Sequence, residues 1–72
     1  MMGKYKEAIN DFDEALRLNP SSINTYMNRS LAWKGLGNYA AALQDALTAK
    51  QKGNPVDENY LQQLRALSGV KE

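Results

Sequence analysis

Apolar side chains recur at intervals of three and four residues along several stretches of this chain, beginning near its N-terminus. In residues 4–18 these positions are Tyr5, Ala8, Ile9, Phe12, Ala15 and Leu16. This spacing predicts an amphipathic helix, with acidic residues in its early and middle turns and Arg17 in its last turn. Pro20 is expected to end the helix because proline lacks an amide donor and disfavours helical backbone at Asn19.

A second helix is expected over residues 23–34, with the hydroxyl of Ser21 or Ser22 as its N-terminal cap. Its expected buried residues are Ile23, Tyr26, Met27, Ser30 and Trp33. The small side chain in the middle of this set would allow a neighbouring helix axis to approach closely. Gly35 or Gly37 is expected to adopt the left-handed backbone conformation of a tight turn.

Two more helices are expected, over residues 39–52 and from about residue 57 to residue 68. The third ends at Gly53-Asn54-Pro55, and Asp57 can cap the fourth. The expected buried residues of the third helix are Tyr39, Ala42, Leu43, Ala46 and Ala49. The apolar face of the fourth helix consists of Tyr60, Leu61, Leu64 and Leu67. Because the connections contain only a few residues, consecutive helices should be antiparallel, and the sequence predicts an all-α fold.

The pattern repeats itself along the chain at a fixed interval of 34 residues. Gly3, Tyr5, Ala8, Asp11 and Ala15 return as Gly37, Tyr39, Ala42, Asp45 and Ala49. Tyr26, Ala32 and Gly35 likewise return as Tyr60, Ala66 and Gly69. A fixed period of this length is typical of helical repeat proteins.

Composition narrows the range of functions. The chain has 72 residues, enough for one small domain, with no cysteine, no histidine and a net charge of +1. It therefore lacks the commonest general base and the commonest metal ligands, and we expect neither an enzyme nor a metal or cofactor site. We expect a cytoplasmic protein that binds neither nucleic acid nor membrane, since it has no basic run and no apolar run of about 20 residues.

Residues 21–54 resemble a tetratricopeptide repeat. The resemblance rests on the pattern Gly37-x-Tyr39-x-x-Ala42, on Ala49 and the proline that follows it, and on an aromatic-small-aromatic helix of Tyr26, Ser30 and Trp33. It implies an α-solenoid fragment with helices in the order B-A-B-A, forming one domain over residues 1–72. Residues 3–20 would be the B helix of a first repeat, residues 21–54 a complete repeat, and residues 55–72 the A helix of a further repeat.

In this family the A helices line a concave surface that binds peptides or helices of partner proteins. The resemblance therefore implies a non-catalytic scaffold for protein–protein interaction. The expected partner-binding residues are Asn24, Met27, Asn28, Leu31, Lys34, Leu61, Gln62 and Arg65. Side-chain amides can bond an extended peptide backbone, and aliphatic side chains can fill pockets. The same composition would also fit an ordinary solvated helix face.

Two alternatives concern the kind of partner. Asn28 resembles the asparagine of the carboxylate clamp with which co-chaperones of this family bind the C-terminal peptides of heat-shock chaperones. However, Glu58 and Gln62 stand where this clamp has lysine and arginine, and a negative Glu58 would repel a carboxylate. RNA binding by a helical array is less favoured, because the lysines are scattered among acidic residues.

Both ends of the chain are expected to be incomplete repeats, since the first helix would lack its A partner and the last its B partner. Apolar residues expected to be exposed there are Tyr5, Phe12, Leu64 and Leu67. Terminal repeats normally need a polar capping face. We therefore expect a homodimer or a larger self-assembly that covers these residues.

Overall fold

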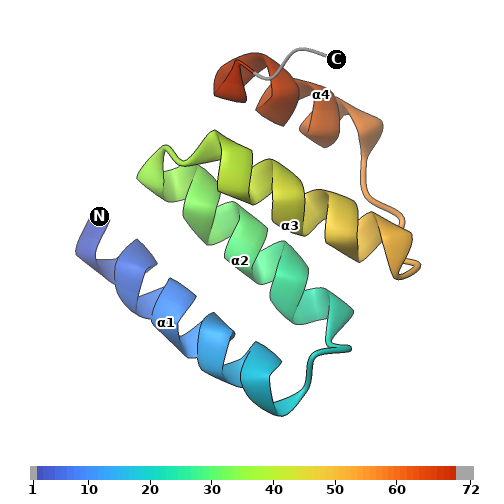
Figure 1. Ribbon diagram of the computed structural model, residues 1–72. Coiled ribbons are helices and arrows are strands. Elements are labelled where there is room, and N and C mark those ends of the chain that lie inside the picture. The colour runs from blue at the N-terminus through green and yellow to red at the C-terminus, as the bar shows by residue number, and fades with distance from the viewer. Residues whose placement is uncertain (1, 70–72) are drawn as a thin grey trace.

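The computed structural model describes residues 2–69, which form four α-helices and no strand in that range. These are α1 (Met2–Leu18), α2 (Ile23–Leu36), α3 (Tyr39–Gln51) and α4 (Glu58–Ser68). Each helix packs against the next in the chain and runs antiparallel to it (Figure 1). The molecule is thin, with extents of 32 × 29 × 16 Å, and the predicted all-α fold is confirmed.

The connection between α1 and α2 is a tight turn around Pro20. The carbonyl oxygen of Asn19 accepts a hydrogen bond from the amide of Ser22 at 3.2 Å. Ser22 is the N-cap residue of α2, as predicted, but its hydroxyl does not bond the helix backbone. It lies 2.7 Å from the hydroxyl of Thr25 instead, so the predicted hydroxyl-to-backbone cap is wrong.

Gly37 makes the turn between α2 and α3. Its φ of 86° lies in the left-handed region, and its amide donates to the carbonyl oxygen of Lys34 at 3.0 Å. The next amide, of Asn38, donates to the carbonyl oxygen of Trp33 at 2.9 Å, which completes a Schellman motif. Asn38 then caps α3, because its side-chain oxygen accepts from the amide of Ala41 at 3.2 Å.

Gly35 serves a different purpose from Gly37, although the sequence could not separate the two. It stays within α2, and a Cβ atom at this position would lie closer than 3.0 Å to the ring of Tyr5. The missing side chain therefore makes room for an aromatic ring of α1 and allows the first turn of α1 to lie against the last turn of α2.

The core is centred on α3. It consists of the buried residues Ala42, Leu43, Ala46, Leu61 and Leu64. Half-buried residues of α2, α3, the following loop and α4 pack around it, namely Met27, Trp33, Tyr39, Val56 and Tyr60. The buried set predicted for α3 is confirmed for its alanines and leucine, while its tyrosine is only partly covered.

The prediction for α1 is correct only in part. Ile9 and Leu16 are buried, and Tyr5 is 36% exposed, as the sequence indicated, but Ala15 is also exposed. The reason is that α2 is the helix that packs against α1, so it covers one flank of the apolar stripe and leaves the other open. The residue 34 positions after Ala15 is Ala49, which is completely buried because α3 has helices on both sides.

The apolar residues of α4 also differ from the prediction. Leu67 is 47% exposed, as predicted. Leu64 is fully buried and belongs to the core, so its predicted exposure is wrong. Since α4 turns Leu61 and Leu64 toward α3, this end of the described helices covers more of its own apolar surface than the sequence indicated.

Candidate functional site

The exposed face of α2 carries three of the predicted partner-binding residues. Asn24, Asn28 and Leu31 are all exposed, and their spacing of four and then three residues places them on one side of the helix. Leu31 is 53% exposed. These three side chains form what we call the α2 face.

Lys34 links the α2 face to α4. Its ammonium group donates to the side-chain carbonyl oxygen of Gln63 at 3.3 Å and lies 5.4 Å from the centre of the Tyr60 ring. The hydroxyl of Tyr60 is in turn 2.9 Å from the hydroxyl of Ser30. Lys34 is therefore held by the chain itself, and Met27, also half-buried, packs against the core beside it.

The predicted residues on α4 have unequal access to solvent. Gln62 is exposed and Arg65 is half-buried. Leu61 is fully buried in the core, so the expectation that it contacts a partner does not fit this structure. The helical spacing placed Leu61 at the edge of the exposed side of this helix, but α4 is rotated so that this edge faces α3.

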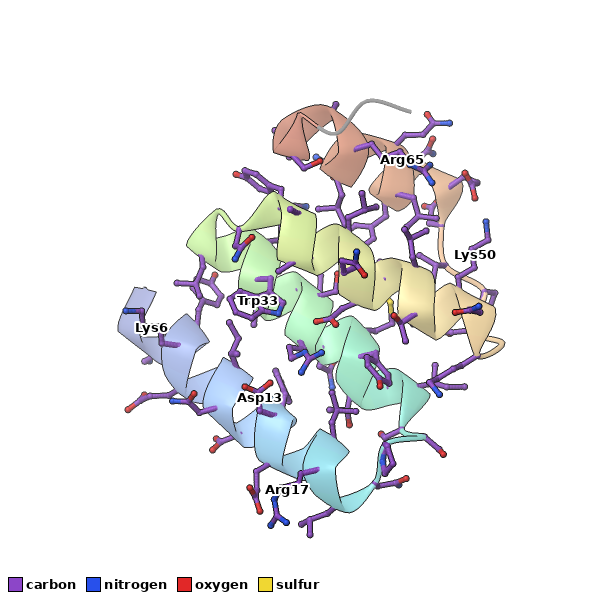
Figure 2. The ribbon with its side chains drawn as sticks, viewed as in Figure 1. Lys6, Asp13, Arg17, Trp33, Lys50 and Arg65 are labelled. Carbon is purple, nitrogen blue, oxygen red and sulfur yellow. The ribbon has the colours of Figure 1, made fainter. Side chains whose placement is uncertain are left out.

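Glu58, which the resemblance to the carboxylate clamp sets in place of a basic residue, is exposed at the start of α4. It accepts a hydrogen bond from Lys50 at 2.7 Å, across the junction of α3 and α4. Figure 2 shows Lys50 near the end of α3, beside the start of α4. This hydrogen bond, aided by the positive charges of Lys50 and Arg65, holds the pKa of Glu58 below its ordinary value. Glu58 therefore stays negative and would repel an incoming carboxylate.

A cluster of charges that sequence reasoning missed joins α1, α2 and α3. The guanidinium of Arg29 donates to both carboxylate oxygens of Asp45, each at 2.7 Å, and to Asp13 at 2.7 Å. Asp45 is only 5% exposed. The hydrogen bonds to Asp45 raise the pKa of Arg29 further above its already high value, so the guanidinium stays charged. The available signal was an acidic residue within the otherwise apolar face of the third predicted helix.

An open cleft of about 290 Å³ lies between α1 and α2. Its lining residues are Lys6, Ile9, Asn10, Asp13, Trp33 and Leu36. Figure 2 shows Trp33 facing α1, with Lys6 toward one end of that helix and Asp13 nearer its middle. The sequence assigned Trp33 to interhelix packing; the indole does pack against the core, yet one part of it is also open to this cleft.

The described part of the chain offers no other obvious chemistry. Within residues 2–69 no three His, Cys, Asp or Glu residues come together in a group that could hold a metal ion. None of the four described helices is both long enough and apolar enough to cross a membrane.

The chain is similar to part of several plant proteins. It is 46% identical over 44 residues to Hsp70-Hsp90 organizing protein 1 of Glycine max, which is 61% of this chain and 8% of that protein. The corresponding identity is 37% over 43 residues for Hsp70-Hsp90 organizing protein 3 of Arabidopsis thaliana, covering 60% of this chain and 8% of the relative. The identity to the Hsp70-Hsp90 organizing protein of Triticum aestivum is 42% over 43 residues, which is 60% of this chain and 7% of that protein. The chain thus spans less than a tenth of each relative, and no solved structure matches it.

The family comparison agrees with the resemblance seen in the sequence. The model of the TPR repeat, the tetratricopeptide repeat, matches residues 2–37. This range is half of the chain and contains α1, α2 and the glycine that turns the chain into α3. Together with the packing of sequential antiparallel helices, this match shows that the chain belongs to the tetratricopeptide repeat family.

Proposed function

We propose that this chain is a non-catalytic module that binds a peptide or a helix of a partner protein through the α2 face and the adjoining surface of α4. The observation that carries the proposal is Leu31, an aliphatic side chain 53% exposed beside the amides of Asn24 and Asn28. The amides can hydrogen-bond a peptide backbone, and the leucine offers apolar contact area. Membership of the tetratricopeptide repeat family supports a role in protein–protein interaction.

The proposed site keeps all but one of the residues expected from the sequence. Leu61 is left out because it is buried. The residues that remain are Asn24, Met27, Asn28, Leu31, Lys34, Gln62 and Arg65. The centre of the site is the α2 face, because its three side chains are exposed and hold no described hydrogen bond that a ligand would have to break.

Removing side chains from the α2 face should weaken peptide binding. A peptide selected against this chain from a random display library would serve as the probe. We expect Leu31→Ala or Asn28→Ala to raise its Kd by about three- to tenfold, since each removes a contact worth about 1 kcal/mol. Isothermal titration calorimetry measures the Kd, and far-UV circular dichroism confirms that the exposed substitutions leave the helices intact.

The chain provides a matched control for each of these substitutions. Gln44 is an exposed amide on α3, and Leu18 is 72% exposed at the end of α1. Neither Gln44→Ala nor Leu18→Ala should change the Kd of the selected peptide. If Leu31→Ala and Asn28→Ala had no larger effect than these controls, or if no peptide could be selected, the proposed site would be rejected.

A second candidate ligand is the C-terminal peptide of a heat-shock chaperone. The names of the Hsp70-Hsp90 organizing proteins and the exposure of Asn28 favour it, whereas the ionised Glu58 opposes it. Titration with a C-terminal Hsp90 peptide should therefore show little binding, and Glu58→Lys should raise the affinity about tenfold by removing a like-charge contact. The peptide with an amidated C-terminus is the control; equal binding of both forms would exclude carboxylate recognition.

The proposal also includes self-association and a cytoplasmic location. Of the four side chains expected to be exposed at the ends, Tyr5 and Leu67 are exposed and Phe12 is half-buried, while the burial of Leu64 leaves less surface to be covered than the sequence suggested. We do not propose RNA binding, because Arg17, Arg29 and Lys50 each pair with a carboxylate of this chain and are not displayed as a basic surface.

A further inference from the structure

The cleft between α1 and α2 is a separate surface from the site proposed above. Trp33 follows Asn28 by five residues, which places it about 140° further around α2. Trp33 and Leu36 therefore point to the same side of α2 as Arg29, which bonds both α1 and α3. The α2 face points away from that side. A ligand in this cleft would not touch the α2 face.

The floor of this cleft is apolar. Ile9 is 5% exposed, while Trp33 and Leu36 are half-buried. The volume of about 290 Å³ is just below the ~300–1,000 Å³ typical of ligand pockets, which suits one or two inserted side chains of a larger partner. An indole in such a place is a common anchor of protein–protein contacts.

The two polar ends of the cleft carry opposite charges. Lys6 forms no ion pair with the described residues, so one end presents an uncompensated positive charge. At the other end Asp13 shares the guanidinium of Arg29 with Asp45, and two carboxylates with one guanidinium leave a net negative charge. Lys6 and Asp13 are seven residues apart on α1, a separation of about 10.5 Å along the axis.

We propose that this cleft binds an amphipathic helix of a partner protein that carries an acidic and a basic side chain two turns apart, with a large apolar side chain between them. The acidic group would face Lys6, the apolar group would rest on Trp33, and the basic group would face Asp13. An α-helix meets this requirement with residues at i, i+3 or i+4, and i+7, because these lie on one face. The order of the two charges in the partner sets its direction along α1.

Synthetic helical peptides test this proposal. Two alanine-based peptides would carry glutamate, leucine and lysine at this spacing, one in each order of charge. Trp33 is the single tryptophan of the chain, so its fluorescence reports directly on occupation of the cleft. We expect at least one of the two peptides to shift this fluorescence saturably, and its leucine-to-alanine version to bind at least fivefold more weakly.

Reversal of charge provides the decisive comparison. Lys6→Glu should raise the Kd of the peptide that binds the original protein by about five- to tenfold, because the new glutamate then faces the glutamate of the peptide. A peptide with a second lysine in place of its glutamate should recover the lost affinity toward this variant. Lys4→Glu is the control, because Lys4 is exposed on α1 but does not line the cleft.

Three results would overturn the proposal: no fluorescence change with either peptide, equal effects of Lys6→Glu and Lys4→Glu, or no recovery with the lysine-substituted peptide. Leu31→Ala separates this site from the proposed function, since it should leave binding of the helical peptides unchanged. If Leu31→Ala weakened binding of the helical peptides as much as Lys6→Glu does, the peptides would bind the α2 face and not the cleft.

Discussion

Ser30→Leu is expected to lower the free energy of unfolding by about 3–5 kcal/mol, and so to leave much of the protein unfolded. Ser30 is completely buried, and its hydroxyl donates to the carbonyl oxygen of Ala42 at 2.7 Å. A leucine has no room at this contact between α2 and α3 and would also remove the hydrogen bond. A chain of this size is expected to have only ~4–11 kcal/mol of stability in total.

Two further substitutions separate crowding from loss of the hydrogen bond. Ser30→Ala keeps the side chain small and should cost only about 1 kcal/mol. Asn28→Leu adds a leucine to the same helix at an exposed position and should change stability by no more than about 0.5 kcal/mol. Urea unfolding followed by far-UV circular dichroism measures all three. If Ser30→Leu were no worse than Ser30→Ala, the close approach of α2 and α3 would not depend on a small residue.

The positions of the helices could be read from the sequence because local chemistry decides them. Pro20 and Gly37 end α1 and α2 through backbone conformations that do not depend on distant residues. The 34-residue repeat then fixes which apolar residues correspond, and α3, with neighbours on both sides, buries its stripe as predicted. The predicted set of α2 is less well confirmed: Ser30 is buried, but Ile23, Tyr26, Met27 and Trp33 are only half-buried although α2 also has a helix on each side.

The exposure of the terminal helices could not be read in the same way, because it depends on which neighbours are present. Ala15 and Ala49 are equivalent in the repeat, yet the first is exposed and the second is fully buried. Leu61 and Leu64 were placed at an edge and at an open end, but the rotation of α4 against α3 buries both. A helical pattern shows which residues share a face and leaves open what that face contacts.

The candidate site shows the same division between local and tertiary information. The exposure of the α2 face was predictable because Asn24, Asn28 and Leu31 all lie off the apolar stripe of the second helix, and the structure exposes all three. The cleft beside Trp33 was not, because its lining comes from two helices that only the folded chain brings together. The pairing of Arg29 with Asp45 was also missed, because 16 residues separate them and only the folded chain brings them together.

Arg29→Met should be the second most damaging substitution, with a loss of about 3 kcal/mol of unfolding free energy. Asp45 is 5% exposed, and its carboxylate accepts two hydrogen bonds from Arg29. Methionine would preserve much of the aliphatic stem but leave this carboxylate buried without its counter-ion. Removing one partner of a buried ion pair costs more than the pair itself contributes, because the remaining charge is not solvated.

A double-mutant cycle distinguishes this mechanism from a simple loss of packing. Once Asp45 has also been replaced by leucine, no uncompensated carboxylate remains, so Arg29→Met/Asp45→Leu should recover at least half of the loss. Arg17→Met is the matched control, because Arg17 pairs with Glu14 on the exposed side of α1 and its removal should leave the free energy of unfolding nearly unchanged. Additive losses in the double variant, measured by urea unfolding, would show that Arg29 stabilises the three helices through its stem and not through its charge. Recovery would instead show that the loss in Arg29→Met comes from the buried carboxylate of Asp45, which lacks a counter-ion in that variant.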